Sequence, residues 1–207
     1  MIKKPQGYDD APAFTGESQQ LPKGKYVCKI VQVATVQSSN GNEQFVILYD
    51  IAEGEHKGFY QKLFDADKAQ NPNGAKWRGV FKQNMEGRGL SWFKGVVTAI
   101  ERSNNFTFQW DKADNEKIFK DKKFGGIFRR RQYEAENGSR PIVTELFRIR
   151  SVAGLAEAEL PEDELLPNEP ANSGPIRASA PTPSNVGDGF MNIPDGADED
   201  AGIPFLS

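Results

Sequence analysis

Two stretches in the first third of the chain have the Val- and Ile-rich composition of β-strands. Residues 25–37 form the first, and residues 43–53 form the second. The Asn40-Gly41 pair between them is a strong hairpin signal, because both turn positions tolerate positive φ. A turn over residues 53–58 leads into the apolar residues 59–64, where a third strand is expected. The pattern therefore predicts three antiparallel strands in a meander.

The apolar period then changes to three- and four-residue steps, which are typical of helices. One helical piece is expected around residues 77–81 and a second over residues 90–102, with Gly87 and Gly89 dividing them. A short strand over residues 106–110 is expected to follow.

The last predicted elements are two strands, over residues 123–134 and 141–150, joined by an Asn137-Gly138 turn. Three strands, a helical insertion and a closing hairpin give the strand order of the OB-fold. The fold class is therefore predicted to be mainly β, as a five-stranded OB-fold-like barrel. An open α+β sheet is the alternative.

Composition divides the chain into three parts. Residues 1–20 are polar and broken by Pro and Gly, which predicts a flexible arm, and residues 21–152 carry the predicted domain. Residues 153–207 are rich in Pro, Glu, Ala, Ser and Asn. Such a stretch buries too little apolar surface to offset the entropy cost of ordering, so a disordered tail is expected.

Charge follows the same division. The net charge of −3 combines a tail of −10 over residues 151–207 with a body of +7 over residues 1–150. A basic body with an acidic tail is an expected layout for a nucleic-acid binder, although tails that only aid solubility look alike. The chain has neither an apolar run long enough to span a bilayer nor a signal peptide, so an intracellular protein without a membrane partner is expected.

The strongest site-like feature is the run of residues 120–133, which interleaves cations with aromatic rings. Single-stranded nucleic acid needs this combination, because cations follow the phosphates while bases stack on rings. Strand alternation places Phe128 and Arg130 on one face and Arg129, Arg131 and Tyr133 on the other. The plainer interpretation is that Phe124 and Phe128 are core and the arginines form a solvated edge.

Further candidate contacts come from the first three predicted strands and the turn before the third. The complete predicted DNA-binding set is Lys25, Lys29, Tyr49, Lys57, Tyr60, Lys62, Lys122, Lys123, Phe124, Phe128, Arg129, Arg130, Arg131 and Tyr133. Trp77 and Trp92 are expected to be core, with a stacking role as the alternative.

Residues for enzymatic chemistry are sparse. His56 is the only histidine, and it is expected to be a plain turn residue. Cys28 is the only cysteine, and it is expected to be a small core residue. Zinc sites built from Cys and His are excluded, and no metal or other cofactor is expected. Gly125-Gly126 lacks the spacing of a phosphate-binding loop and is expected to form a strand bulge. The remaining enzymatic hypothesis is a nuclease that binds Mg²⁺ through carboxylates of Asp50, Glu53, Glu55, Asp65 and Asp67.

The C-terminus carries an acidic cluster followed by an apolar tip. Asp198, Glu199 and Asp200 precede Ile203, Pro204 and Phe205. This arrangement resembles the C-terminal tip of bacterial single-stranded DNA-binding proteins, in which carboxylates steer and apolar residues anchor a partner. The tip is therefore expected to recruit a partner protein, and the alternative is an acidic tail that only keeps the protein in solution. In the bacterial tip Phe is the terminal residue, whereas Leu206 and Ser207 follow it here.

Three turn signatures add a family resemblance over about residues 21–150. The signatures are, in this order, Leu21-Pro22-Lys23-Gly24-Lys25-Tyr26, Ser39-Asn40-Gly41-Asn42 and Glu53-Gly54-Glu55-His56-Lys57-Gly58. The sequence thereby resembles a phage-encoded family of single-stranded DNA-binding proteins. The resemblance implies an OB-like domain that coats single-stranded DNA during phage replication or recombination, in the cytoplasm of the bacterial host.

The sequence thus favours a non-enzymatic, sequence-tolerant single-stranded DNA-binding protein. Its expected partners are single-stranded DNA and, through the tip, replication or recombination proteins, and a homo-oligomer is possible. A protein-binding adaptor or recombination mediator that uses the same sheet is the alternative. The Mg²⁺ nuclease ranks third.

Overall fold

The computed structural model describes residues 3–4 and 19–167 of the chain. Its centre is a five-stranded antiparallel sheet in the order β3-β2-β1-β4-β5. The strands are β1 (Gly24–Gln37), β2 (Glu43–Ile51), β3 (Val80–Asn84), β4 (Lys123–Gln132) and β5 (Ile142–Arg150). The mainly β class is thereby confirmed. The predicted barrel is not closed, because β3 and β5 do not pair and remain the two edges of an open sheet.

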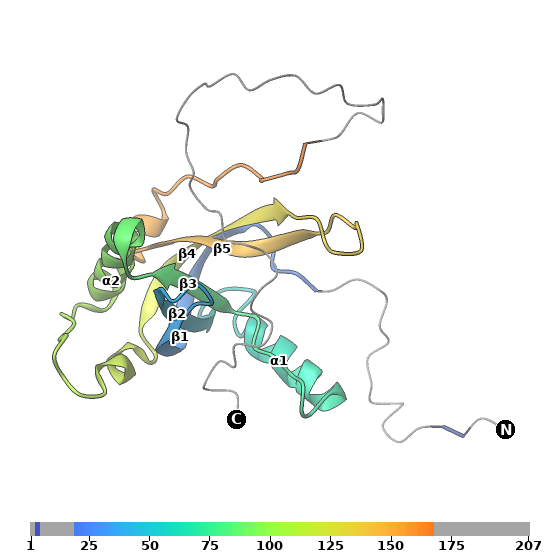
Figure 1. Ribbon diagram of the computed structural model, residues 1–207, viewed down its shortest axis with the longest axis horizontal. Helices are drawn as coiled ribbons and strands as arrows, with labels where there is room; N and C mark the ends of the chain where they lie inside the picture. Colours follow the sequence, from blue (N-terminus) through green and yellow to red (C-terminus); the bar gives the residue numbers. More distant parts are fainter. Residues whose placement is uncertain (1–2, 5–18, 168–207) are drawn as a thin grey trace. The chain divides into compact units, whose positions relative to one another are not determined.

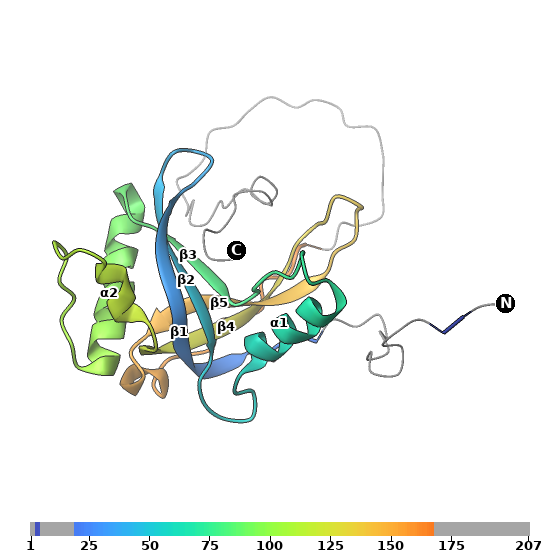
Figure 2. The same cartoon turned by 90° about the horizontal axis from the view of Figure 1, so that it is seen from below.

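The length of β1 explains how one sheet curls around a core. Its first half, from Gly24 to Lys29, pairs with β4, and its second half, from Cys28 to Gln37, pairs with β2. A register shift between Ile30 and Gln32 marks the bend, as bulges sharpen the local twist. Consequently β1 and β2 cross β4 and β5 in Figure 2.

Two helices flank the sheet on opposite sides, α1 (Phe59–Gln70) beside β2 and α2 (Leu90–Asn104) against β4 and β5 (Figure 1). The predicted helix over residues 90–102 is thus confirmed as α2, preceded by the short 3₁₀ turn η1 (Gly87–Gly89). Its buried face consists of Phe93, Val96, Val97, Ala99 and Ile100. None of the helices within the described ranges combines the length and the apolar character that crossing a bilayer requires.

Three predicted elements were wrong. Residues 59–64 are the start of α1 rather than a strand, and residues 77–81 include the first two residues of β3 and form no helix. A short apolar run fits either period, and tertiary contacts decided both cases. Trp77 donates its ring N–H to the carbonyl oxygens of Tyr49 and Gly79, both at 3.2 Å, which holds the chain extended beside β2.

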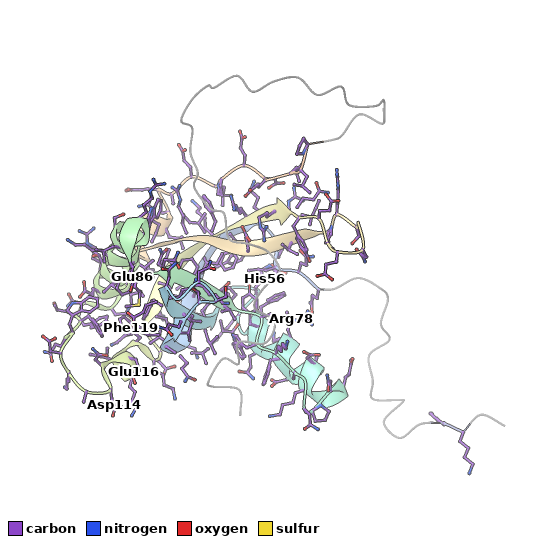
Figure 3. All side chains as sticks on the ribbon, viewed as in Figure 1. His56, Arg78, Glu86, Asp114, Glu116 and Phe119 are labelled. Carbon is purple, nitrogen blue, oxygen red and sulfur yellow. The ribbon has the colours of Figure 1, made fainter. Side chains whose placement is uncertain are left out.

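Residues 106–110 are the third difference, because they form no strand. Side chains bind the backbone there: the Glu101 carboxylate accepts the Phe108 N–H at 2.7 Å, and the Asn115 amide donates to the Trp110 carbonyl at 2.6 Å. The 3₁₀ turn η2 (Asn115–Phe119) then inserts Phe119, which is fully buried, into the core. In Figure 3, Asp114 and Glu116 lie on the outer side of this loop.

The body ends later than predicted. After β5, the 3₁₀ turn η3 (Ala153–Leu155) buries Leu155, and contacts of the body continue to Leu165 rather than ending at residue 152.

A buried carboxylate starts α1. Asp50, at the end of β2, accepts the N–H groups of Ile51 at 2.8 Å and of Tyr60 at 2.9 Å. It thereby satisfies a free donor in the first turn of the helix, as a capping residue does, while Gly58 supplies the left-handed φ of 71° that precedes the helix.

Replacing Asp50 by Ala is therefore expected to lower the free energy of unfolding by about 1 to 3 kcal/mol, because two buried N–H groups lose their acceptor. Urea unfolding followed by circular dichroism measures this loss. Asp50→Asn keeps the carbonyl oxygen and should recover most of the stability. Asp65→Ala, at an exposed position of α1, is the matched control. Equal stability of the Ala variant and the wild type would contradict the capping role.

Candidate nucleic-acid interface

An extended acidic segment lies against the basic end of β4. We call this segment, residues 156–165, the strap. Pairing between β1 and β4 stops at Gly24 and Phe128, so the last residues of β4 have no β1 partner. The strap fills this edge: Glu164 N–H donates to the Arg130 carbonyl at 2.9 Å, and its carbonyl accepts the Gln132 N–H at 2.8 Å. The orange segment beside β4 and β5 in Figure 1 is this part of the chain.

Four cations from two segments hold the strap. Lys25 Nζ donates to the carbonyls of Ala156 at 2.8 Å and Ala158 at 3.1 Å. The other three, Lys23, Arg130 and Arg129, bind strap carboxylates. We call Lys23, Lys25, Arg129 and Arg130 the cationic track.

The carboxylate contacts of the track centre on Asp163 and Glu164. Asp163 pairs with Lys23 at 2.8 Å and with Arg130, and Glu164 pairs with Arg129 at 2.6 Å. The hydrogen bonds from Lys23 and Arg130 lower the pKa of the Asp163 carboxyl below its usual value. The carboxylate therefore stays ionised at neutral pH, and the strap presents negative charge to the track.

The outer face of β4 also carries Arg131. Glu145, opposite Arg129 on β5, binds Arg129 at 2.9 Å and Arg131 at 3.0 Å through its two oxygens. Arg129 and Arg131 thus share a face, as strand alternation predicts, and Arg131 lies 5.7 Å from the ring of Tyr133. Arg129 is the most enclosed of the three arginines, and Arg130 is the most exposed.

The remaining predicted cations do not join the track. Lys29 and Lys123 lie at the opposite end of β4, where they pair with Asp121 at 3.8 Å and Glu53 at 2.6 Å. Lys122 lies 4.9 Å from the ring of Phe106. Lys57 and Lys62 are exposed, in the turn before α1 and on α1 itself.

Four predicted stacking residues lie in the core. Phe124 and Phe128 are 0% exposed, and Tyr49 and Tyr60 are 2% and 6% exposed. Their rings pack on one another around Tyr49, at centroid distances between 5.2 and 6.0 Å. Burial raises the pKa of Tyr60 to about 12. A ring enclosed by other side chains presents no face to a base, so the core interpretation of these residues is the one that agrees with their burial.

The glycine pair on β4 is also part of the packing. Gly125 and Gly126 pair regularly with β1 and β5, and the predicted bulge is displaced to Phe147 on β5. A side chain at Gly126 would place its Cβ 2.9 Å from the sulfur of Cys28, which is closer than packed atoms allow. Cys28 itself is buried, as predicted.

The carboxylates proposed for Mg²⁺ are not gathered in one place. Asp50 starts α1, Glu53 binds Lys123, and Asp65 accepts the amide of Gln61 at 2.9 Å. Within residues 3–4 and 19–167, no group of three or more His, Cys, Asp or Glu side chains is arranged to hold a metal ion. His56 packs edge-on against Tyr26 at 5.7 Å between ring centroids, in the turn region labelled in Figure 3.

Sequence reasoning missed Lys23 and the strap as a whole. It also missed Phe147 and Arg148 on β5, where the Phe147 ring lies 4.3 Å from the guanidinium of Arg129 and 4.7 Å from that of Arg148. The run Leu146-Phe147-Arg148-Ile149-Arg150 has the same mixture of rings and cations that singled out β4, so it could have been found. The strap could not have been found from the sequence, because an acidic segment that contains Pro is typical of a linker. The predicted tip, residues 198–205, lies outside the described residues. No protein-family model and no curated protein matches the chain.

Proposed function

We propose that this protein is a non-enzymatic, sequence-tolerant single-stranded DNA-binding protein that acts in phage DNA replication or recombination. One observation carries the proposal: an extended chain that presents carboxylates and carbonyl oxygens already lies along a track of four cations. The backbone of single-stranded DNA is likewise extended and negatively charged, and such strands bind in positively charged grooves. The strap thus has the shape and charge of the proposed ligand.

The fold supports the same proposal. A strand order of β3-β2-β1-β4-β5 with α2 between β3 and β4 is the order of an OB-fold whose barrel is open between β3 and β5. The OB-fold recurs in proteins that bind single strands. The family resemblance and the tip, which we propose recruits replication or recombination proteins, rest on the sequence alone.

Titration with a thymine homopolymer and with duplex DNA, at several salt concentrations, tests the proposal. Binding should be saturable, weaker for duplex, and reduced by salt, because phosphate contacts release counterions. Intrinsic tryptophan fluorescence reports it, with a gel shift as an independent readout. Absence of binding in both assays at low salt would refute the proposal.

The track itself is tested by the double variant Lys25→Ala, Arg130→Ala. Its affinity for the homopolymer should fall, and the slope of log affinity against log salt should become shallower by about 1.4, at about 0.7 per lost phosphate contact. Lys112→Ala, Lys120→Ala is the matched control, because it removes two exposed lysines from the loop around η2. Equal slopes for the two double variants would show that net charge, rather than the track, sets the affinity.

A protein-binding adaptor is the second candidate. The observation that favours it is the backbone pairing between Glu164 and the edge of β4, because this edge accepts an extended peptide. An adaptor of this kind would bind peptide with little response to salt and would leave the homopolymer unbound.

A further inference from the structure

A bulge in β5 brings a ring and a cation to the same side of the sheet. Ile127 pairs with Arg148 and Phe128 pairs with Leu146, so Phe147 is an extra residue without a partner on β4. Neighbours in a regular strand point to opposite faces, whereas a bulge redirects a side chain. Leu146 and Ile149 are buried, whereas Phe147 and Arg148 are both only partly buried.

Four side chains from three elements then form a row in which cations and rings alternate. The guanidinium of Arg129 on β4 lies 4.3 Å from the centre of the Phe147 ring. Arg148 lies 4.7 Å from the same ring and 5.4 Å from the ring of Trp92 on α2. We call Arg129, Phe147, Arg148 and Trp92 the stack.

The position of Trp92 is not explained by the packing of α2. The buried face of this helix is formed by Phe93, Val96, Val97, Ala99 and Ile100, and Trp92 is 38% exposed beside it. The cation at its ring is Arg148 of β5, at 5.4 Å from the ring centre. A large, flat side chain is thus held at the surface beside a guanidinium group.

This arrangement fits the chemistry of an unpaired nucleobase with its phosphate. Bases stack on aromatic rings and on the planar guanidinium group, while neighbouring cations bind the phosphates. The stack is also continuous with the cationic track, because Arg129 binds Glu164 of the strap on one side and covers Phe147 on the other. A strand that replaces the strap along β4 would reach Phe147 next and Trp92 after it.

We infer that the stack, on the outer face of β4, β5 and α2, is the base-stacking site of this protein. This assignment rests on the proposed function and deepens it. In this assignment bases stack at the partly buried ring of Phe147 and the exposed ring of Trp92, instead of at the core rings of Phe124 and Phe128. The path of the strand then runs from the edge of β4 across β5 to α2.

The test compares Trp92→Ala and Phe147→Leu with the wild type in binding to a fluorescein-labelled thymine homopolymer. Each variant should bind about 5- to 150-fold more weakly, which corresponds to one stacked base at about 1 to 3 kcal/mol. The salt slope should stay unchanged, because stacking releases no counterions. This combination separates the stack from the track, whose variants change the slope.

Trp110→Ala is the matched control, because Trp110 is 55% exposed and its ring packs against Phe93 and Phe108 rather than against a cation of the stack. It should bind like the wild type. Thermal unfolding followed by circular dichroism checks that each variant is folded. If Phe147→Leu is unfolded, the homopolymer affinity of Trp92→Ala alone tests the stack.

The two proposals fail in different ways. Wild-type affinity in Trp92→Ala and Phe147→Leu, with the wild type binding the homopolymer, would overturn the stack and leave the proposed function intact. Weakening by Trp110→Ala to the same extent would also overturn it, because any exposed tryptophan would then have the effect. A wild type that does not bind the homopolymer at low salt would overturn both.

Discussion

Replacing Asp163 by Asn and Glu164 by Gln is expected to raise the affinity of the protein for a thymine homopolymer by about tenfold. The two carboxylates hold Lys23, Arg129 and Arg130, so DNA can use these cations only after the strap has moved. Apparent affinity falls in proportion to the fraction of molecules that are competent to bind. A strap that covers the track about nine-tenths of the time therefore lowers the affinity about tenfold, and the variant removes this reduction.

A matched variant separates the strap from simple electrostatics. Glu157→Gln, Glu159→Gln changes the net charge by the same amount at two exposed positions of the same segment. Its affinity should rise far less. Fluorescence anisotropy at constant salt measures both. Equal gains in the two double variants would attribute the effect to net charge, and unchanged affinity in the Asp163, Glu164 variant would show that the strap does not compete with DNA.

Replacing Phe124 by Ala is expected to lower the free energy of unfolding by about 3 to 5 kcal/mol, which is a large part of the stability of an ordinary domain. Phe124 is fully buried on β4, and its ring packs against Tyr49 at 5.9 Å between centroids. Truncation removes apolar contacts and leaves a cavity that the surrounding side chains cannot fill. Chemical unfolding measures the loss.

Phe124→Leu distinguishes the core role from base stacking. Leucine keeps an apolar side chain of similar size, so the fold should persist with a smaller loss of stability, but it has no aromatic face. Homopolymer affinity should equal that of the wild type. A folded Leu variant with clearly weaker DNA binding would restore Phe124 to the binding surface.

The elements that sequence predicted well are those whose signals are local. Asn40-Gly41 and Asn137-Gly138 stand at hairpins, and Gly41 and Gly138 have the positive φ values of 79° and 75° that such turns need. Residues 90–102 have an apolar stripe long enough to separate a helix from a strand, and they form most of α2. Each of these features depends on residues within a few positions of one another.

The elements that sequence predicted wrongly depend on distant residues. Residues 59–64 form a helix because the carboxylate of Asp50, on β2, binds its first turn. Residues 80–84 form a strand because β2 offers an edge beside Trp77 and Gly79. The same pattern of apolar residues fits either structure, and the partner is not adjacent in the sequence.

The candidate site divides in the same way. The sequence by itself determined the basic, aromatic composition of β4, the mainly β class and the separation of charge between body and tail, because these are properties of residue type and local order. Only the tertiary structure decided which rings are buried, which cations the strap holds and how a bulge aligns Phe147 with Arg148 and Trp92. The physical reason is that burial, ion pairing and stacking are contacts between residues far apart in the chain, and strand register sets which of them meet.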